Sequence, residues 1–449
     1  MTTFKSFLLL LCISFSLQAY AQEKVTAREV LSLDKGWSFH KGDIPYPVIK
    51  GHNATYRNAK AGYVSGAASP NYDDSSWRIV DIPHDWAIEG RVNPEANLSQ
   101  GYYDRGFGWY RRKFKLSPED KGKHLELQFD GIATHATIWV NGTVLHRNWC
   151  GYTSMYIDIT PYATYGDDVN TIAVRVDAEA QEGWWYEGAG IYRHTWLVKR
   201  SPLHIITDGV FANPVKKTES QWEIPVEVSL YNSGKLTADG EVEVTLLAPD
   251  GQPIATKNQK LSVKALREGI ANLPITVTKP LFWSPENPVL YKVKTQVKQN
   301  GTVTDEVETK CGFRTIRFDN NTGFWLNGEN IKIKGVCNHQ DHAGVGVAVP
   351  DALWEFRLRK LKEMGVNAYR VAHNPVAKEF MAACDSIGIM VLDENRLFNT
   401  SPEYVRQLEW QVRRDRNCPS VILWSVFNEE PMQGTENGVE MVRRMYDVV

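Results

Sequence analysis

The sequence predicts a multidomain chain in which two β-sandwiches, one of jelly-roll and one of immunoglobulin-like type, precede part of a (β/α)₈ TIM barrel. Apolar and polar residues alternate over most of residues 22–313, which is the period of half-buried β-strands. After residue 330, four short apolar runs end in polar residues, and a helical pattern follows each run. Repeated strand–helix units predict a parallel sheet whose faces are covered by helices.

Length and charge limit the classes of function. The chain has 449 residues, enough for two to four domains, and a net charge of −2 from 51 basic and 53 acidic residues. No basic patch favours a nucleic-acid partner. The 15 tryptophans suit sugar stacking, but they suit large sandwich cores equally well.

Residues 1–21 have the pattern of a signal peptide. Lys5 supplies the positive charge, Phe7–Leu17 is mostly apolar, and Ala19–Ala21 fits a cleavage site of small residues. No other stretch is long and apolar enough for a bilayer, so we expect an exported protein, periplasmic or secreted, with no membrane anchor after cleavage. The five remaining cysteines are scattered, which favours buried free thiols over disulfides or a metal site.

Residues 22–201 predict the first sandwich. Leu125, Leu127 and Phe129 alternate with polar residues, as expected of an antiparallel strand with one buried face. Asn141-Gly142 after an apolar run predicts a type I′ hairpin turn. Without any long helical pattern, about 180 residues of this kind suit a jelly roll.

Residues 202–313 predict the second sandwich. Alternation recurs in strand after strand, for example at Ile224, Val226 and Val228. A region of about 110 residues with such spacing suits an immunoglobulin-like sandwich that lacks the disulfide.

Residues 314–449 predict the parallel region. The predicted strands are Ile331–His339, Asn367–Asn374, Ile389–Asn395 and Val421–Glu430, and the predicted helices between them are Asp351–Met364, Ala377–Ile387 and Pro402–Arg416. A closed barrel needs about 250 residues, roughly twice this length. Either the domain is an open half with two unpaired edge strands, or the chain stops partway through a barrel, and we favour the second interpretation.

Chemistry in parallel α/β folds gathers at the carboxyl ends of the strands. The polar residues that the pattern places there are His339, His373, Asn374, Asp393, Glu394, Asn428, Glu429 and Glu430.

Several motifs resemble those of glycoside hydrolase family 2, the β-galactosidase and β-glucuronidase family, and most closely its exported bacterial β-galactosidase-like members. The motifs span most of the chain after residue 21, and their order and spacing are together specific. They are Ile82–Trp86, Gly108–Arg112, Phe129–Gly131, Ile138–Gly142, Gly188–Arg193, Gly335–His339, Arg370–Pro375 and Leu423–Glu429.

The resemblance implies a retaining glycosidase with two carboxyl groups about 5–5.5 Å apart. It implies that Glu429 is the general acid/base and that Asn428 binds the sugar 2-hydroxyl. The alternative is that Glu429 and Glu430 are solvated loop charges near a helix N-terminus. By the same resemblance, His339, His373 and Asn374 line the sugar pocket.

Three residues near these strand ends, and one run of the first sandwich, are each open to two interpretations. Arg370 braces the catalytic carboxylates, or it forms a structural ion pair with Asp393 or Glu394. Asp393 and Glu394 contact the substrate, or they are strand-end carboxylates held by arginines. The Trp184–Tyr186 run and Glu187 either reach the barrel site from the first sandwich or form a packed aromatic turn.

The sequence departs from the family pattern in its last residues. The nucleophile of the family is a Glu on a later strand, whereas Glu436 and Glu440 lie in a helical pattern, so we expect the nucleophile beyond Val449. Some members bind magnesium through a Glu and a His, but Asn395–Thr400 contains neither, so we expect no metal or other cofactor. A metal site at His339 and His342 is a weak alternative.

The leading hypothesis is therefore an exported β-galactosidase-type glycosidase that acts on terminal β-linked sugars of oligo- or polysaccharides. β-Glucuronidase and β-mannosidase are alternatives within the family. A non-catalytic carbohydrate-binding chain is an alternative of another class, because the nucleophile is missing. Exposed edge strands also leave open a homo-oligomer, or a second polypeptide that completes the site.

Overall fold

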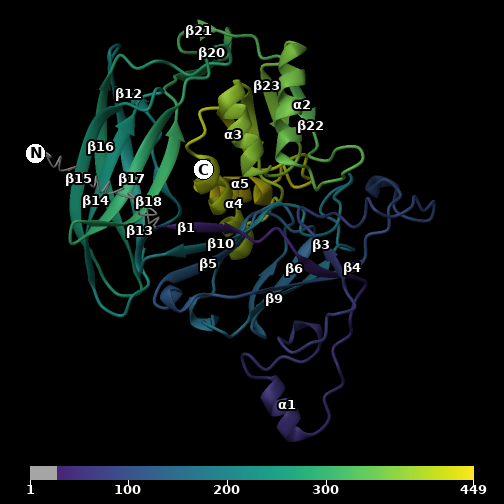
Figure 1. The fold of residues 1–449 in the computed structure, drawn as a ribbon. Helices are drawn as coiled ribbons and strands as arrows, with labels where there is room; N and C mark the ends of the chain where they lie inside the picture. Colours follow the sequence, from purple (N-terminus) through teal and green to yellow (C-terminus); the bar gives the residue numbers. More distant parts are fainter. Residues whose placement is uncertain (1–27) are drawn as a thin grey trace, which may run out of the picture.

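The computed structural model describes residues 28–449, and its three parts follow one another along the chain (Figure 1). The predicted signal peptide, residues 1–21, lies outside the described residues. Within residues 28–449, no helix has the length and apolar character needed to cross a membrane.

The first sandwich consists of two antiparallel sheets of four and six strands, in the orders β1-β10-β5-β8 and β3-β2-β4-β9-β6-β7. Leu125, Leu127 and Phe129 point from one sheet into a core that also contains Ile138 and Val140 from the other. The strands are β1 (Glu29–Ser32), β2 (Trp37–Lys41), β3 (Arg78–Val80), β4 (Phe107–Phe114), β5 (His124–Phe129), β6 (His135–Val140), β7 (Thr143–Asn148), β8 (Met155–Asp158), β9 (Asn170–Asp177) and β10 (Thr195–Arg200).

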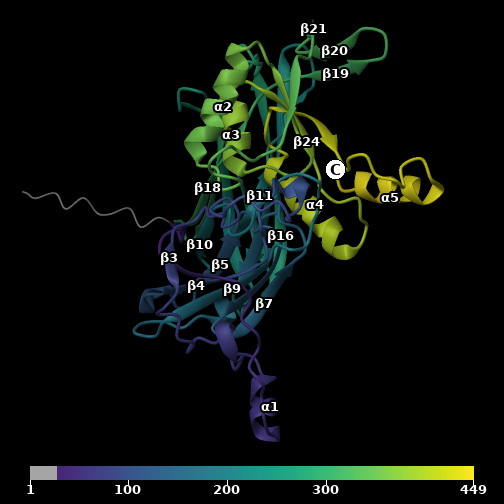
Figure 2. The ribbon, with the colours of Figure 1, turned by 90° about the vertical axis from the view of Figure 1, so that its right-hand side faces the viewer.

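The turn between β6 and β7 has the predicted form. Asn141 and Gly142 have φ angles of 50° and 75°, and Val140 pairs with Thr143 across the turn. Positive φ at both central positions is the requirement of a type I′ turn, so this prediction is confirmed. The only α-helix in the described part of this sandwich is the short, solvent-exposed α1 (His52–Asn58), which extends away from the sheets (Figure 2).

The second sandwich also has two four-stranded sheets. β13 pairs with β11, β12 and β16 in one sheet, and the order β15-β14-β17-β18 forms the other. Val226 and Val228 of β13 pack in one core with Val242 and Val293 of the facing sheet, which confirms the predicted immunoglobulin-like sandwich. The strands are β11 (Leu203–Phe211), β12 (Val215–Lys216), β13 (Gln221–Asn232), β14 (Ala238–Leu247), β15 (Pro253–Val263), β16 (Arg267–Thr278), β17 (Tyr291–Gln299) and β18 (Thr302–Cys311).

A small antiparallel sheet of β19 (Ile316–Asp319), β20 (Gly323–Leu326) and β21 (Glu329–Asn330) leads into the parallel sheet. The parallel order is β22-β23-β24-β25, so β22 and β25 are the edge strands of the described part of the barrel. The strands are β22 (Gly335–Asn338), β23 (Ala368–Val371), β24 (Met390–Glu394) and β25 (Val421–Ser425); the helices are α2 (Asp351–Glu363), α3 (Lys378–Ile387), α4 (Pro402–Asp415) and α5 (Glu436–Tyr446).

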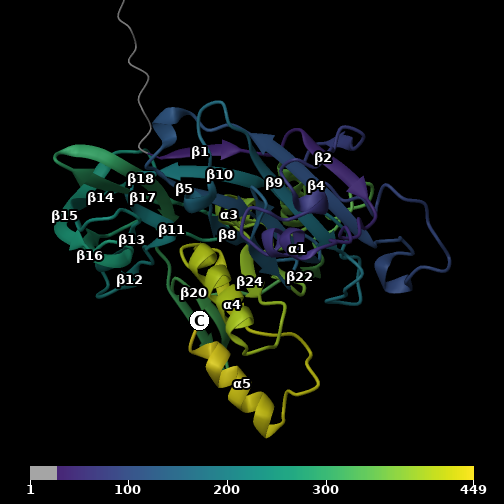
Figure 3. The same ribbon diagram turned by 90° about the horizontal axis from the view of Figure 1, so that it is seen from below.

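The helices pack as the apolar spacing predicts. Trp354 and Leu358 of α2 and Phe380 of α3 cover Tyr369 and Val391 of the sheet. Helix α5 extends outward from the sheet (Figures 2 and 3), and its Met445 packs on Leu408 and Val412 of α4.

Polar contacts attach the sandwiches to the barrel part. Arg193, buried in the first sandwich, donates from Nη2 to Gln340 Oε1 and to the carbonyl oxygen of Pro375, both at 2.8 Å. Asn417 of the barrel part exchanges hydrogen bonds with the backbone at Val210 and Ala212 in the second sandwich. The Arg193 contacts hold the first sandwich over the loops that follow β22 and β23, and the Asn417 contacts attach the second sandwich to the segment after α4.

Candidate active site

The carboxyl ends of β23, β24 and β25 converge on one buried carboxylate, Glu394. Arg370 Nη2 of β23 lies 2.9 Å from Glu394 Oε1 and 2.8 Å from Oε2. The same nitrogen donates to Asn428 Oδ1 at 2.7 Å. Arg370 therefore ties the last residue of β24 to the segment that follows β25.

Glu394 has further partners on both sides. His373 Nδ1 lies 3.0 Å from Oε1, and Ser425 Oγ donates to Oε2 at 2.9 Å. The Glu394 side chain is only 1% exposed, and a buried carboxylate is tolerated when it is paired and hydrogen-bonded. Of the two ion pairs considered for Arg370, the structure contains the one with Glu394.

Asp393, the neighbour of Glu394, lies outside this cluster. Successive residues of a strand point to opposite faces of the sheet, and Asp393 Oδ1 accepts a hydrogen bond from Gln411 Nε2 of α4 at 3.0 Å. Burial, together with the charge of Asp415, raises the pKa of Asp393 well above its ordinary value. Asp393 therefore faces α4, whereas Glu394 faces the strand-end cluster.

Asn428 and Glu429 follow β25 directly. Asn428 is 6% exposed, and because Arg370 occupies its amide oxygen, the amide nitrogen remains as its free donor. Glu429 is exposed and forms no hydrogen bond or ion pair with the rest of residues 28–449, and Glu430 is half-buried. An oriented amide and an unbonded carboxyl group thus follow one another in the chain after β25.

His339, His373 and Asn374 occupy the neighbouring strand ends. The His339 and His373 rings lie 5.4 Å apart in an edge-to-face arrangement. Burial and the adjacent His373 lower the pKa of His339, which favours the neutral imidazole. His339 Nδ1 and Asn374 Nδ2 are buried without a hydrogen-bond partner in the described chain, which is unusual for polar side-chain atoms.

A loop of the first sandwich reaches this cluster. The Trp185 ring stacks on His339 at 4.8 Å, and the Trp184 ring lies 6.3 Å from His373. Trp185 is 8% exposed, whereas Trp184 is 60% exposed. This run therefore reaches the barrel, which is the first of its two interpretations. Glu187 does not reach the barrel and is buried in an ion pair with Arg105.

Arg396 and Ser425 were not among the residues that the sequence singled out. The Arg396 guanidinium lies 4.9 Å from the Trp185 ring centre, and Nε donates to the carbonyl oxygen of Glu182 at 2.8 Å. Arg396 thereby fastens the sandwich loop to the end of β24. Its place two residues after Glu394 could have pointed to it, whereas nothing in the sequence distinguished Ser425.

The described residues contain one group of side chains close enough to share a metal ion, and it is not in this cluster. It consists of His194, Asp351 and Glu379. His194 Nδ1 already lies 2.7 Å from Asp34 and Nε2 lies 3.1 Å from Asp351, and the hydrogen bond with Asp34 raises the pKa of His194 to about 9. A protonated His194 thus links the first sandwich to α2. His339 and His342 belong to no such group.

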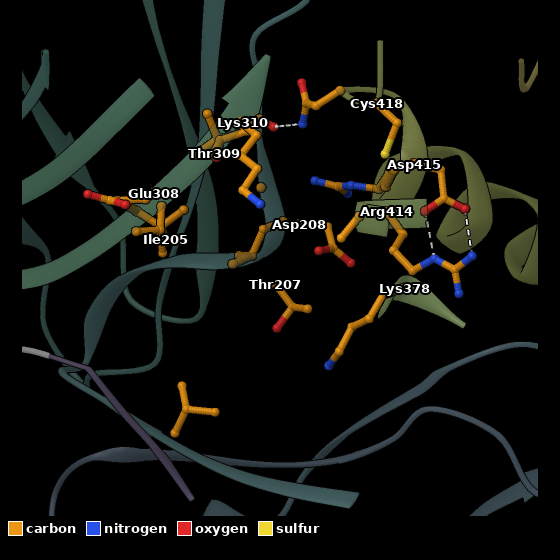
Figure 4. Close-up of a pocket in the computed structure, with 18 of the residues that line it drawn as sticks. Ile205, Thr207, Asp208, Glu308, Thr309, Lys310, Lys378, Arg414, Asp415 and Cys418 are labelled. Carbon is orange, nitrogen blue, oxygen red and sulfur yellow. Dashed lines mark hydrogen bonds and ion pairs between the residues drawn. The ribbon is translucent and has the colours of Figure 1, made fainter. Parts of the chain in front are cut away.

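A cavity of about 450 Å³ lies where the sandwiches meet α3 and α4 (Figure 4). None of the predicted site residues lines it. Its charged groups are largely matched, as in the Arg414–Asp415 and Arg28–Asp305 pairs. It is therefore a junction between domains and not part of the strand-end cluster.

Comparison with known proteins agrees with this arrangement. Residues 95–222 match the galactose-binding-like domain of glycosyl hydrolase family 2, residues 203–314 match a second region of that family, and residues 318–448 match its TIM barrel domain. The chain belongs to glycoside hydrolase family 2, with the TIM barrel domain partially covered.

Individual relatives carry two different activities in their names. A β-galactosidase of Bacteroides ovatus is 35% identical over 90% of this chain and 47% of its own length. A β-glucuronidase of Bacteroides fragilis is 30% identical over 82% of this chain and 55% of its own length. The chain thus spans about half the length of these relatives.

Solved structures of the family superpose well. A family 2 member from Bacteroides cellulosilyticus has a TM-score of 0.82 at 34% identity, over 93% of this chain and 55% of that one. A β-glucuronidase of Bacteroides uniformis has a TM-score of 0.79 at 28% identity, over 94% of this chain and 50% of that one. The two sandwiches and the partial barrel are therefore the arrangement of this family.

Proposed function

We propose that the protein is a retaining glycosidase of the β-galactosidase type, with Glu429 as general acid/base. The observation that carries the proposal is the pair at the end of β25, where a buried, Arg370-oriented Asn428 precedes the unbonded carboxyl group of Glu429. A general acid needs access to the leaving oxygen, and an amide donor beside it suits the 2-hydroxyl, whose contact strengthens in the transition state.

The neighbouring groups support a sugar as the ligand. His339 Nδ1 and Asn374 Nδ2 are buried polar atoms without protein partners, and Trp184 presents an exposed indole ring beside His373. Sugars combine hydroxyl groups with an apolar ring face, so both kinds of contact are available at one place. The substrate we propose is a terminal β-linked sugar of an oligo- or polysaccharide.

In the proposed reaction, Glu429 protonates the leaving oxygen while a second carboxylate attacks the anomeric carbon. Glu429 then removes a proton from the water that hydrolyses the glycosyl-enzyme. Glu394 is poorly suited to attack, because Arg370, His373 and Ser425 occupy its oxygens. Within residues 28–449 no strand follows β25, and Glu436 lies in α5, so we assign no second carboxylate among the described residues.

β-Glucuronidase activity is the second candidate, because relatives and solved structures with that name match over most of this chain. Hydrolysis of nitrophenyl β-galactoside and of nitrophenyl β-glucuronide distinguishes these two activities, and nitrophenyl β-mannoside tests for β-mannosidase activity. We expect the galactoside to be the best substrate, with a product of retained configuration. A preference for the glucuronide would replace the galactosidase assignment, and an inverted product would contradict the mechanism.

We also propose that the protein is exported, since residues 1–21 have the pattern of a secretory leader. Amino-terminal sequencing of the protein recovered from the producing cells tests this. The expected first residue is Gln22, and an intact leader on a cytoplasmic protein would contradict export.

A further inference from the structure

Arg193 of the first sandwich is a buried cation that reaches the barrel part. It is 4% exposed, and within residues 28–449 the hydrogen bonds of its guanidinium all end on neutral oxygens. Arginine is almost never this deeply buried without a carboxylate partner, because a buried charge is costly to desolvate. The placement of Arg193 therefore needs an explanation beyond packing.

The two terminal nitrogens of Arg193 bind different domains. Nη1 donates to the carbonyl oxygens of Tyr152 at 2.9 Å and of Asp130 at 3.2 Å, both in the first sandwich. Nη2 donates to Gln340 Oε1 and to the carbonyl oxygen of Pro375, both at 2.8 Å and both in the barrel part. Because the donors of a guanidinium have a rigid, planar geometry, one side chain fixes two barrel loops relative to the sandwich.

Both barrel partners of Arg193 are next to residues of the strand-end cluster. Gln340 directly follows His339, and Pro375 directly follows Asn374. His339 and Asn374 lie in the loops after β22 and β23, outside any helix or strand, so no regular ladder of backbone hydrogen bonds holds them. Arg193 therefore links the positions of these two residues to that of the first sandwich.

A second arginine holds one of these loops from within the barrel part. Arg357 of α2 donates to the carbonyl oxygens of His339 at 3.2 Å and of Gln340 at 3.1 Å. Of the two arginines, only Arg193 also contacts the loop after β23. Loss of the Arg193 contacts should therefore displace the two loops relative to one another, while Arg357 keeps the loop after β22 in its conformation.

We propose that Arg193 is a positioning residue of the sugar site, through which the first sandwich sets the separation of His339 and Asn374. The proposal rests on the glycosidase function proposed above, which places these two residues at the sugar. Glu429 follows β25, and none of the hydrogen bonds of Arg193 reaches that segment. Arg193 should therefore affect how tightly the substrate binds, and not the rate of proton transfer.

Hydrolysis by Arg193→Lys tests the proposal, with Arg111→Lys as the matched control. Arg111 is a 1% exposed arginine of the same sandwich that also donates to backbone carbonyl oxygens, those of Ala67 and Ser69, but it makes no contact with the barrel part. Lysine keeps the charge but lacks the planar fork of donors. With the nitrophenyl glycoside that the unchanged protein hydrolyses best, Arg193→Lys should raise KM roughly tenfold and change kcat by less than about twofold.

The control separates positioning from folding. Both substitutions disturb a buried arginine, so a rise in KM that occurs only in Arg193→Lys cannot come from lost stability alone. Equal KM values in the two variants, or a fall in kcat at unchanged KM in Arg193→Lys, would overturn the positioning role and leave the proposed hydrolysis untouched.

Hydrogen exchange adds a measurement that needs no sugar. Arg193→Lys should speed exchange in residues 339–347 and 373–377, whereas Arg111→Lys should leave both segments unchanged. Equal exchange in the two variants would overturn the role of Arg193. Faster exchange only in Arg193→Lys, in a protein that hydrolyses no glycoside, would support the link between the domains and contradict the proposed function.

Discussion

Two carboxyl groups at neighbouring strand ends, Glu394 and Glu429, are held in opposite ways. Glu394 ends β24, is buried, and bonds to Arg370, His373 and Ser425. Glu429 follows β25, is exposed, and has no partner within residues 28–449. The fold fixes the first group through three side chains and leaves the second free to meet another molecule.

This difference separates positioning from reaction. Because both oxygens of Glu394 are occupied, this carboxylate holds Arg370 in place, and Arg370 in turn orients Asn428. An unoccupied carboxyl group beside that fixed amide can exchange a proton with a ligand. The end of β24 therefore holds the neighbouring groups in place, and the segment after β25 carries the group that can react.

Removal of Arg370 from the Glu394 cluster should cause the largest loss in the free energy of unfolding. The Arg370→Ala change leaves Glu394 buried without its cation, which costs about 3–5 kcal/mol in the free energy of unfolding. Urea denaturation measures this loss. Arg359→Ala removes an exposed pair with Glu355 and should cost at most about 1 kcal/mol, so equal losses in the two variants would contradict the account.

Trp184 and Trp185 of the first sandwich differ in the same way as Glu429 and Glu394, because one is exposed and the other is buried. Trp185 is buried against His339, so Trp185→Ala should cost about 3 kcal/mol in the free energy of unfolding. Trp184 is mostly exposed, so Trp184→Ala should change that free energy by less than about 0.5 kcal/mol. Thermal or urea unfolding of the pair measures both values, and the reverse order would mean that Trp184 holds the loop.

A rise in pH from acidic to neutral should destabilise the fold through Glu182, which lies in the same loop. Burial raises the pKa of Glu182 to about 8 from an ordinary value of 4.5, and its Oε1 is buried without a partner. The folded state therefore keeps a proton that the unfolded state releases. Stability falls as pH rises from about 4.5 to about 8, by up to about 1.4 kcal/mol for each pH unit.

Glu182→Gln should remove this slope. The free energy of unfolding of the variant, measured between pH 5 and pH 8, should fall less steeply than that of the unchanged protein. Identical slopes would mean that Glu182 is ionised in the folded protein at neutral pH.

The sequence predicted the long elements well because their periodicity is local. Helix α2 begins at Asp351, as the apolar spacing predicts, and α4 begins at Pro402. The first parallel strand was predicted from Ile331, but β22 begins at Gly335. The run before it alternates apolar and lysine residues at an edge of the sheet, where few ladder hydrogen bonds are available.

The site was less predictable, because it depends on which face each strand presents. Asp393 and Glu394 are adjacent and chemically alike, and only the pairing of β24 turns one toward α4 and the other toward the strand-end cluster. Arg396 acts through Glu182, more than 200 residues away, and Ser425 acts through Glu394, more than 30 residues away. No local pattern reveals either partner.

The most direct measurement compares Glu429→Gln with Glu430→Gln in glycoside hydrolysis, since the two carboxyl groups are adjacent and both substitutions keep the side-chain size. With the substrate that the unchanged protein hydrolyses best, the account predicts that Glu429→Gln lowers kcat by about 10²- to 10⁴-fold and that Glu430→Gln changes it little. Full activity of Glu429→Gln, or a loss only in Glu430→Gln, would contradict the assignment of Glu429 as the general acid/base.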